Sequence, residues 1–187
     1  MQLIRVAKEY LRERQSPGIR FLHIAVLLMV ISQIVVSNFA GFDDDGQISK
    51  KIVEYYGTWV HIITGLCLVP IALLFVFVEL KSHGVKHFFP YLSGDHAQLK
   101  NDLMQLRQLT LPEPVSQGIA SIVQGLGLGA LLLVLLSGLT WFISWRYGAS
   151  WSELVKDTHE LLTGLVIAYI VGHGCMGVLH IFYAGKK

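Results

Sequence analysis

Residues 158–180 read THELLTGLVIAYIVGHGCMGVLH, an almost wholly apolar stretch with histidines at positions 159, 173 and 180. A helix of this length, rising about 1.5 Å per residue, can cross the hydrocarbon layer of a membrane. Histidine is costly in that environment, so three of them in one segment indicate a functional site. Their intervals of fourteen and seven residues keep the three side chains on one face of a bundled helix. The stretch therefore predicts a membrane helix with one functional face.

The composition of the whole chain is that of a membrane protein. Of its 187 residues, 53% are hydrophobic and 15% are charged, and the mean hydropathy is +0.54. A soluble domain carries about a quarter charged residues. The formal net charge is only +2, and no basic cluster is interleaved with aromatic residues. Membrane lipid is therefore an expected partner and nucleic acid is not.

Four segments are long and apolar enough to span a membrane, at roughly residues 20–40, 57–80, 118–145 and 157–183. Because lipid offers no water to the backbone, each segment is expected to be helical. We expect an all-α integral membrane four-helix bundle that forms a single domain over residues 1–187. Two cysteines, Cys67 and Cys175, lie in these apolar runs outside any CxxC pair and are expected to be small core residues.

Basic residues predict the orientation of the bundle. The N-terminal tail, the 81–117 loop and the C-terminus together hold eleven lysines and arginines, whereas the other two loops hold four. Basic loops stay in the cytoplasm, so both termini are expected there. An aromatic belt is then expected on the outer side, formed by Tyr55, Tyr56, Trp59, Trp145 and Trp151.

Two cytoplasmic stretches are amphipathic and are expected to form short helices on the membrane surface. The first covers residues 3–14, and the turn at residues 16–18 is expected to end it. The second covers residues 96–109, with Asp95 as its candidate N-cap. Its apolar stripe consists of Leu99, Leu103, Leu106 and Leu109.

Five histidines lie within or at the edge of the predicted spans: His23, His61, His159, His173 and His180. The axial distance between His159 and His173 is about 21 Å, which is too far for one metal ion and indicates two sites at opposite depths. Depth pairs His61 with His159, and His23 with either His173 or His180. Two histidines facing each other across a bundle suit the axial positions of a b-type haem.

Glycines near these histidines, such as Gly65 and Gly177, leave room for a macrocycle, although close helix packing also favours glycine. For any single histidine, an interhelical hydrogen bond is the alternative to metal ligation. The HELLT sequence at 159–163 begins like the HExxH zinc motif, but Thr163 replaces its second histidine, so a zinc protease is not indicated. The remaining histidines, His83, His87 and His96, are expected to be solvated loop residues.

Three stretches carry a family resemblance: RFLH at 20–23, WVHIITG at 59–65, and HELLTGLVIAYIVGHGCMGVLH at 159–180. The chain resembles the bacterial four-helix cytochrome b family, which includes prokaryotic cytochrome b561, the b-type subunit of nickel–iron hydrogenases and the gamma subunit of formate dehydrogenases. The resemblance covers roughly residues 19–184, and the histidine spacing in the fourth helix is its most specific part. The long 81–117 loop is more similar to the hydrogenase and formate dehydrogenase types.

The resemblance implies two haem b groups. His61 and His159 are then the axial ligands of the outer haem, and His23 and His173 are those of the cytoplasmic haem. His180 becomes a non-ligand close to the cytoplasmic haem. The implied function is electron transfer in the bacterial inner membrane, between the quinone pool and a separate periplasmic c-type cytochrome or dehydrogenase subunit. The alternatives are a superoxide:quinone oxidoreductase acting alone and a haem-free scaffold.

Two further expectations concern residues near the cytoplasmic haem. Arg20 lies one turn before His23 and can pair with a haem propionate. His180 can hydrogen-bond a quinone oxygen and exchange protons, with residues 96–109 as a roof over the same pocket. On the outer side, Asp157 and Glu160 adjoin His159 and are the alternative quinone contacts.

Overall fold

The computed structural model describes residues 5, 9, 12, 15–43 and 45–185. Its long helices are α2 (Pro17–Ser37), α3 (Ile52–His83), α6 (Ile119–Arg146) and α7 (Ser152–Ala184). All four are long and apolar enough to cross a membrane. Within this described part the other elements are α4 (Val85–Phe88), the 3₁₀ turn η1 (Pro90–Ser93) and α5 (Ala97–Arg107), with no β-strand. The predicted all-α membrane fold with four spanning helices is confirmed.

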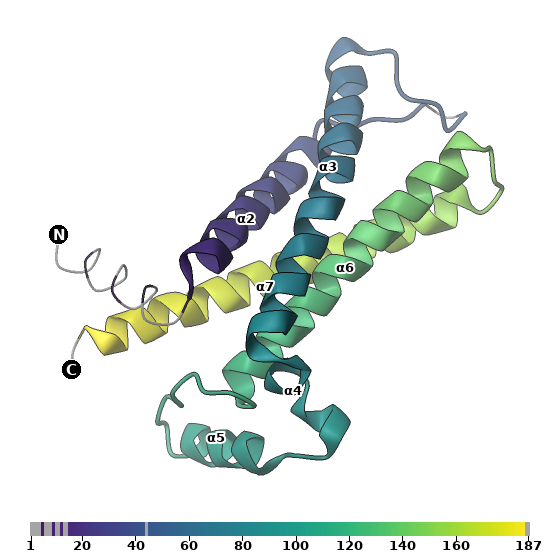
Figure 1. The fold of residues 1–187 in the computed structure, drawn as a ribbon. Helices are drawn as coiled ribbons and strands as arrows, with labels where there is room; N and C mark the ends of the chain where they lie inside the picture. Colours follow the sequence, from purple (N-terminus) through teal and green to yellow (C-terminus); the bar gives the residue numbers. More distant parts are fainter. Residues whose placement is uncertain (1–4, 6–8, 10–11, 13–14, 44, 186–187) are drawn as a thin grey trace.

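The four spans form two hairpins that pack on each other (Figure 1). Helix α2 packs against α3, α6 packs against α7, and α3 joins the hairpins by packing against α6. Successive spans run in opposite directions, so the start of α2, the end of α7 and residues 84–118 lie on one side of the bundle, here called the terminal side. The opposite side, which holds residues 38–51 and 147–151, is called the hairpin side. Figure 1 shows the purple start of α2 near the yellow end of α7.

The core lies where the two hairpins meet. Val30 of α2, Leu68 and Ala72 of α3, Leu131 of α6 and Val166 of α7 belong to one buried cluster. Much of each span instead exposes apolar side chains, as expected for surfaces that face acyl chains.

The two cysteines correct the expectation of core positions, because both Cys67 and Cys175 are exposed. Lipid tails are as apolar as a protein core, so hydrophobicity alone does not tell the two locations apart in a membrane protein.

The spans extend beyond the apolar runs that predicted them. Helix α3 begins at Ile52 and ends at His83, and α7 begins at Ser152. These helices continue into the polar interface, which hydropathy does not register. The Ser-Pro-Gly sequence at 16–18, expected to end the tail stretch, starts α2: the Ser16 hydroxyl accepts a hydrogen bond from the Ile19 N–H, with Pro17 in the first turn. The amphipathic prediction for residues 3–14 falls mostly outside the described residues.

Helix α5 is fixed by a carboxylate rather than by its leucines. Asp102 is buried, and its Oδ2 accepts a hydrogen bond from the Ile119 N–H at 2.8 Å. Its Oδ1 accepts one from Gln98 Nε2 at 2.6 Å. Asp102 therefore caps the first turn of α6, where a negative charge also favours the helix dipole. Asp95 was predicted as the N-cap of this helix, but the N-cap of α5 is His96, which makes no side-chain cap hydrogen bond. Asp95 lies one residue earlier, and its Oδ1 accepts from the Ala97 N–H at 3.3 Å.

The hairpin side is closed by aromatic residues. Trp145 Nε1 donates a hydrogen bond to the Gly46 carbonyl at 2.9 Å, and Phe42 packs edge-on against Trp141. These contacts tie the loop between α2 and α3 to the end of α6. The predicted belt residues all lie on this half of the bundle.

Candidate functional site

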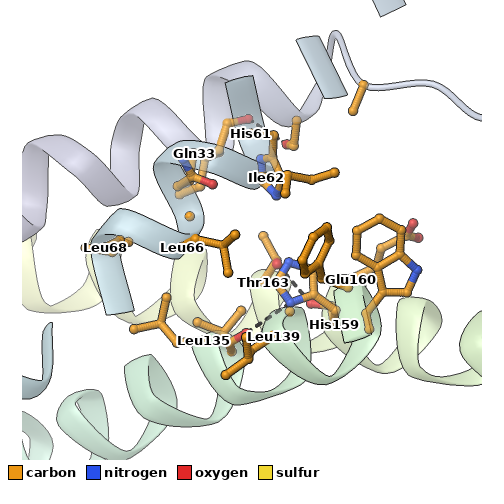
Figure 2. Close-up of a pocket in the computed structure, with 18 of the residues that line it drawn as sticks. Gln33, His61, Ile62, Leu66, Leu68, Leu135, Leu139, His159, Glu160 and Thr163 are labelled. Atoms are coloured by element: carbon orange, nitrogen blue, oxygen red, sulfur yellow. Dashed lines mark hydrogen bonds between the residues drawn. The ribbon is translucent and has the colours of Figure 1, made fainter. Parts of the chain in front are cut away.

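One histidine pair lies in the hairpin-side half of the bundle. His61 of α3 and His159 of α7 have ring centroids 6.3 Å apart and planes inclined by 74°. Figure 2 shows the two side chains pointing toward one another from their helices. An imidazole nitrogen binds a transition metal at about 2.0–2.1 Å, so two rings on opposite sides of one iron have centroids about 6 Å apart. The spacing of this pair fits a single iron between the rings.

The ring of His159 is oriented by α6. Its Nδ1 lies 3.0 Å from the Val134 carbonyl oxygen and 3.0 Å from Ser137 Oγ. A carbonyl only accepts hydrogen bonds, so Nδ1 carries the proton and donates it. Ser137 in turn donates its own hydroxyl hydrogen to Val134 O at 2.9 Å. The Nε2 lone pair of His159 is therefore available to a metal, and the second nitrogen is held as ligating histidines usually are.

A cavity of about 460 Å³ surrounds this pair and is lined by all four long helices. Its volume lies in the usual range for cofactor pockets, and its walls are mainly apolar. Two glycines make room in it, Gly65 and Gly138; a Cβ on Gly138 would lie 2.9 Å from His159 Cε1. His61 Nδ1 is a buried nitrogen without a hydrogen-bond partner among the described residues. The space, the donors and the unpartnered nitrogen fit a planar group with two axial imidazoles.

A second histidine pair lies in the terminal-side half. His23 of α2 and His173 of α7 have ring centroids 6.2 Å apart and planes inclined by 45°. Aromatic faces flank both rings: Phe75 stacks on His23 with centroids 5.8 Å apart, and Tyr169 stacks on His173 at 5.2 Å. Tyr169 occupies a notch at Gly127 of α6, where a Cβ would lie 2.0 Å from its Cζ. This pair has the same ring spacing as the first and a different support.

A family model described as prokaryotic cytochrome b561 matches residues 14–185, which include all four spans and both histidine pairs. The chain belongs to the prokaryotic cytochrome b561 family. It is therefore a membrane b-type cytochrome of an electron-transfer family, binds haem b and crosses a bacterial membrane several times. Comparison with curated proteins and with solved structures found no significant match.

In this cytochrome, both ring nitrogens of His180 lie against backbone carbonyls. Nδ1 is 2.8 Å from Met176 O, and Nε2 is 3.1 Å from Pro112 O in the connection between α5 and α6. A neutral imidazole has one ring N–H, so it donates to one of these two carbonyls at a time. His173 faces His23, whereas His180 contacts the connection between α5 and α6.

The other predicted site residues of the cytochrome lie close in sequence to His23 or His159. Arg20 is partly exposed on α2, one turn before His23. Glu160 lines the cavity beside Lys156, whose Nζ lies 3.8 Å from Glu160 Oε1. Asp157 is exposed. Of the two acids next to His159, only Glu160 is among the residues that line the cavity.

Sequence reasoning missed a polar group inside α3. Glu79 is buried, and its Oε2 lies 3.0 Å from His83 Nδ1. His83 is exposed, as expected for a solvated residue, and His87 is partly exposed. Their rings neighbour each other, and His87 Nδ1 lies 3.0 Å from Ser116 Oγ. The available signal was an acid within an apolar run, four residues before a histidine, because that spacing places both on one helix face.

Proposed function

We propose that this cytochrome holds two haem b groups and passes electrons between a periplasmic redox partner and the membrane quinone pool. His61 and His159 are the axial ligands of the hairpin-side haem, and His23 and His173 are those of the terminal-side haem. The observation that carries the proposal is the presence of two facing histidine pairs, with ring centroids 6.3 and 6.2 Å apart, at opposite depths of one bundle.

The side chains supply ligation, orientation and exclusion of water. Bound haem b supplies a carrier that takes up and releases one electron at a time. Two histidines at each site would hold one haem, and they would leave no iron position open to a substrate. The His159 and His173 side chains are about 21 Å apart along α7, so one helix links the two sites across the membrane.

The excess of lysine and arginine on the terminal side supports a cytoplasmic location for that side and a periplasmic location for the hairpin side. A separate c-type cytochrome or dehydrogenase subunit then meets the hairpin side, near the His61–His159 pair. Arg20, at the cytoplasmic interface next to His23, pairs with a propionate of the terminal-side haem.

The quinone head group binds on the terminal side, beside His180. In this proposal a quinone oxygen takes the place of the Pro112 carbonyl at His180 Nε2, which the structure puts 3.1 Å apart. The roof is the connection around Pro112 rather than α5 itself, because α5 is attached to the start of α6 through Asp102. The alternative quinone site is the pocket beside Glu160 on the hairpin side, and the quinol reduction rate of His180→Ala distinguishes the two sites.

Haem stoichiometry tests the ligand assignment. The purified protein should contain two non-covalent, low-spin haems, measured by haem extraction and a reduced-minus-oxidised spectrum. His61→Ala and His159→Ala should each remove the same haem, and His23→Ala and His173→Ala the other. His96→Ala, in the loop, is the matched control and should retain both. A wild-type stoichiometry near one contradicts the dihaem proposal, and haem loss in His180→Ala with retention in His173→Ala contradicts the ligand set.

The quinone assignment has its own test. His180→Ala should keep both haems and reduce them much more slowly from quinol. Wild-type rates in that variant move the quinone to the pocket beside Glu160. Arg20→Gln should lower the potential of the terminal-side haem, because it removes a positive charge.

The alternative function, superoxide oxidation coupled to quinone reduction, uses the same haem sites. Superoxide is an anion, so a site that binds it should carry positive charge, and Lys156 lines the hairpin-side cavity. Glu160 lies beside Lys156 and offsets its charge, so we prefer electron transfer from a protein partner. Superoxide-dependent quinone reduction by the isolated protein would reverse that preference.

A further inference from the structure

Glu79 is an acidic side chain placed within a spanning helix. It lies one turn before the end of α3, and the residue is only 9% exposed. An ionisable group at such a position is costly and is retained for function by default. Its ion-pair partner among the described residues is His83, whose Nδ1 lies 3.0 Å from Glu79 Oε2 and whose side chain is 32% exposed. The pair thus joins the bundle interior to the surface.

The polar contacts continue outward from His83. Gly84, at φ +80°, ends α3 and lets the chain restart as α4, which brings the His87 ring to 5.1 Å from the His83 ring. His87 Nδ1 lies 3.0 Å from the exposed Ser116 hydroxyl. Burial, and then the neighbouring His83, lower the pKa of His87. His87 is therefore mainly neutral near pH 7, and a neutral imidazole can both accept and donate a proton.

One turn before Glu79, α3 carries a residue that packs against the terminal-side histidine pair. Phe75, one turn earlier on α3, stacks on His23. Tyr169 of α7 stacks on His173 and is close enough to Glu79 to interact with its charge. The titratable groups that face Glu79 are thus His83 from its own helix and Tyr169 from α7. Phe75, Glu79 and His83 follow one another at intervals of four residues on one face of α3, so Glu79 lies one turn from the residue that stacks on His23 and one turn from an exposed imidazole.

We propose that Glu79, His83 and His87 carry protons between the terminal-side redox site and cytoplasmic water during quinone chemistry. This inference rests on the proposed function, and it adds residues to the quinone site assigned to His180. Reduction of a quinone to a quinol takes two electrons and two protons, and a haem held by His23 and His173 would supply the electrons one at a time. Each proton passes from water to the imidazoles, then to Glu79, and then to a quinone oxygen. Quinol oxidation runs the same transfers in reverse.

The structural alternative is that Glu79 and His83, four residues apart, form an ion pair that only stabilises the end of α3. The two explanations predict different results when the carboxyl group is replaced by an amide, which has a similar shape but cannot carry a proton. A structural pair affects stability alone, whereas a proton carrier couples the haem to pH. The test therefore uses Glu79→Gln, with Glu153→Gln as the matched control, an exposed glutamate in the first turn of α7 on the hairpin side.

The first measurement is the midpoint potential of the terminal-side haem as a function of pH. Reduction adds negative charge and favours proton uptake by the Glu79–His83 pair, so the wild-type potential should fall as pH rises. Glu79→Gln should flatten this dependence, Glu79→Asp should retain part of it, and Glu153→Gln should match the wild type. A carboxyl band in the reduced-minus-oxidised infrared spectrum should disappear in Glu79→Gln only.

The second measurement is the rate of haem reduction by quinol. Loss of a positioned proton carrier should slow it by about a hundredfold in Glu79→Gln and less in His83→Gln, which leaves the acid in place. Wild-type pH dependence and wild-type rates in Glu79→Gln with both haems present overturn the inference. If Glu79→Gln does not fold, the same two readouts in His83→Gln decide. A wild-type protein with fewer than two haems would instead contradict the proposed function, before any variant is compared.

Discussion

The two histidine pairs have nearly equal ring spacing but are supported in different ways. On the hairpin side, hydrogen bonds that His159 Nδ1 donates to the Val134 carbonyl and Ser137 Oγ hold the ring of His159. On the terminal side, the rings are held between aromatic faces, Phe75 against His23 and Tyr169 against His173. Hydrogen bonds fix a ring's rotation and tautomer, whereas stacking fixes mainly its plane. The hairpin-side site should therefore respond to polar changes, and the terminal-side site to changes in packing.

The largest expected effects come from two glycines on α6, each next to one site. Gly138→Ala puts a Cβ 2.9 Å from His159 Cε1, and Gly127→Ala puts one 2.0 Å from Tyr169 Cζ. The first should weaken only the hairpin-side haem and the second only the terminal-side haem, as measured by haem content and by each haem's spectrum. Gly129→Ala is the matched control, because its Cβ would meet nothing within 4 Å. Equal damage to both haems by either variant would remove the distinction between the sites.

Next in size is the loss of the aromatic support for His23. Phe75→Ala leaves a cavity in the core beside the ring, and we expect a loss of about 3 kcal/mol in the free energy of unfolding. The terminal-side haem should dissociate first on denaturation in detergent. Phe77→Ala, on the same helix with 62% of the residue exposed, should have little effect on either measurement. If the hairpin-side haem is lost first in Phe75→Ala, packing does not distinguish the two sites.

A smaller effect is expected from the carboxylate that caps α6 on the terminal side. Asp102→Ala removes the acceptor of the Ile119 N–H and should cost about 1 kcal/mol. Hydrogen exchange should increase in the first turn of α6 and in α5, while the hairpin side keeps its protection. Asn101→Ala, an exposed neighbour on α5, serves as the control. Unchanged exchange at Ile119 would mean that the carboxylate does not hold the cap.

The smallest effect should come from Ser137→Ala. The Val134 carbonyl still accepts from His159 Nδ1 in this variant, so the affinity for the hairpin-side haem should fall by less than about tenfold. Haem transfer to an apo-acceptor protein measures this change. Thr140→Ala on the same helix, whose hydroxyl donates only to Leu136 O, is the control. Complete loss of that haem would show that Ser137, rather than the backbone, sets the orientation of the ring.

Much of this arrangement could be predicted from local sequence. The four spans follow from apolar runs, and histidine depth alone pairs His61 with His159. Depth did not distinguish His173 from His180 as the partner of His23, since both lie on the same face of one helix. The choice depends on how α2 crosses α7 and on the Pro112 carbonyl, which lies 68 residues away from His180. Neither is encoded in the helix that carries the histidines.

Other features were hidden for a similar reason. The leucine stripe of α5 predicts a helix that packs its leucines on the membrane surface. The buried residue of that helix is instead Asp102. Its role depends on the free N–H groups at the start of α6, which come close only in the folded chain. Helix ends were also misplaced, because α3 and α7 extend past their apolar runs into the interface.

Both histidine pairs join the first hairpin to α7. His23 and His61 come from α2 and α3, and each partner comes from the last span to be synthesised. On the proposed ligation, a nascent chain cannot complete the hairpin-side pair until the ribosome has passed His159, nor the terminal-side pair until it has passed His173. Loading with haem then follows translation rather than accompanying it, and the first hairpin must wait in the membrane with two unmatched imidazoles. A chain that stops before α7 can be inserted normally and still never become a cytochrome.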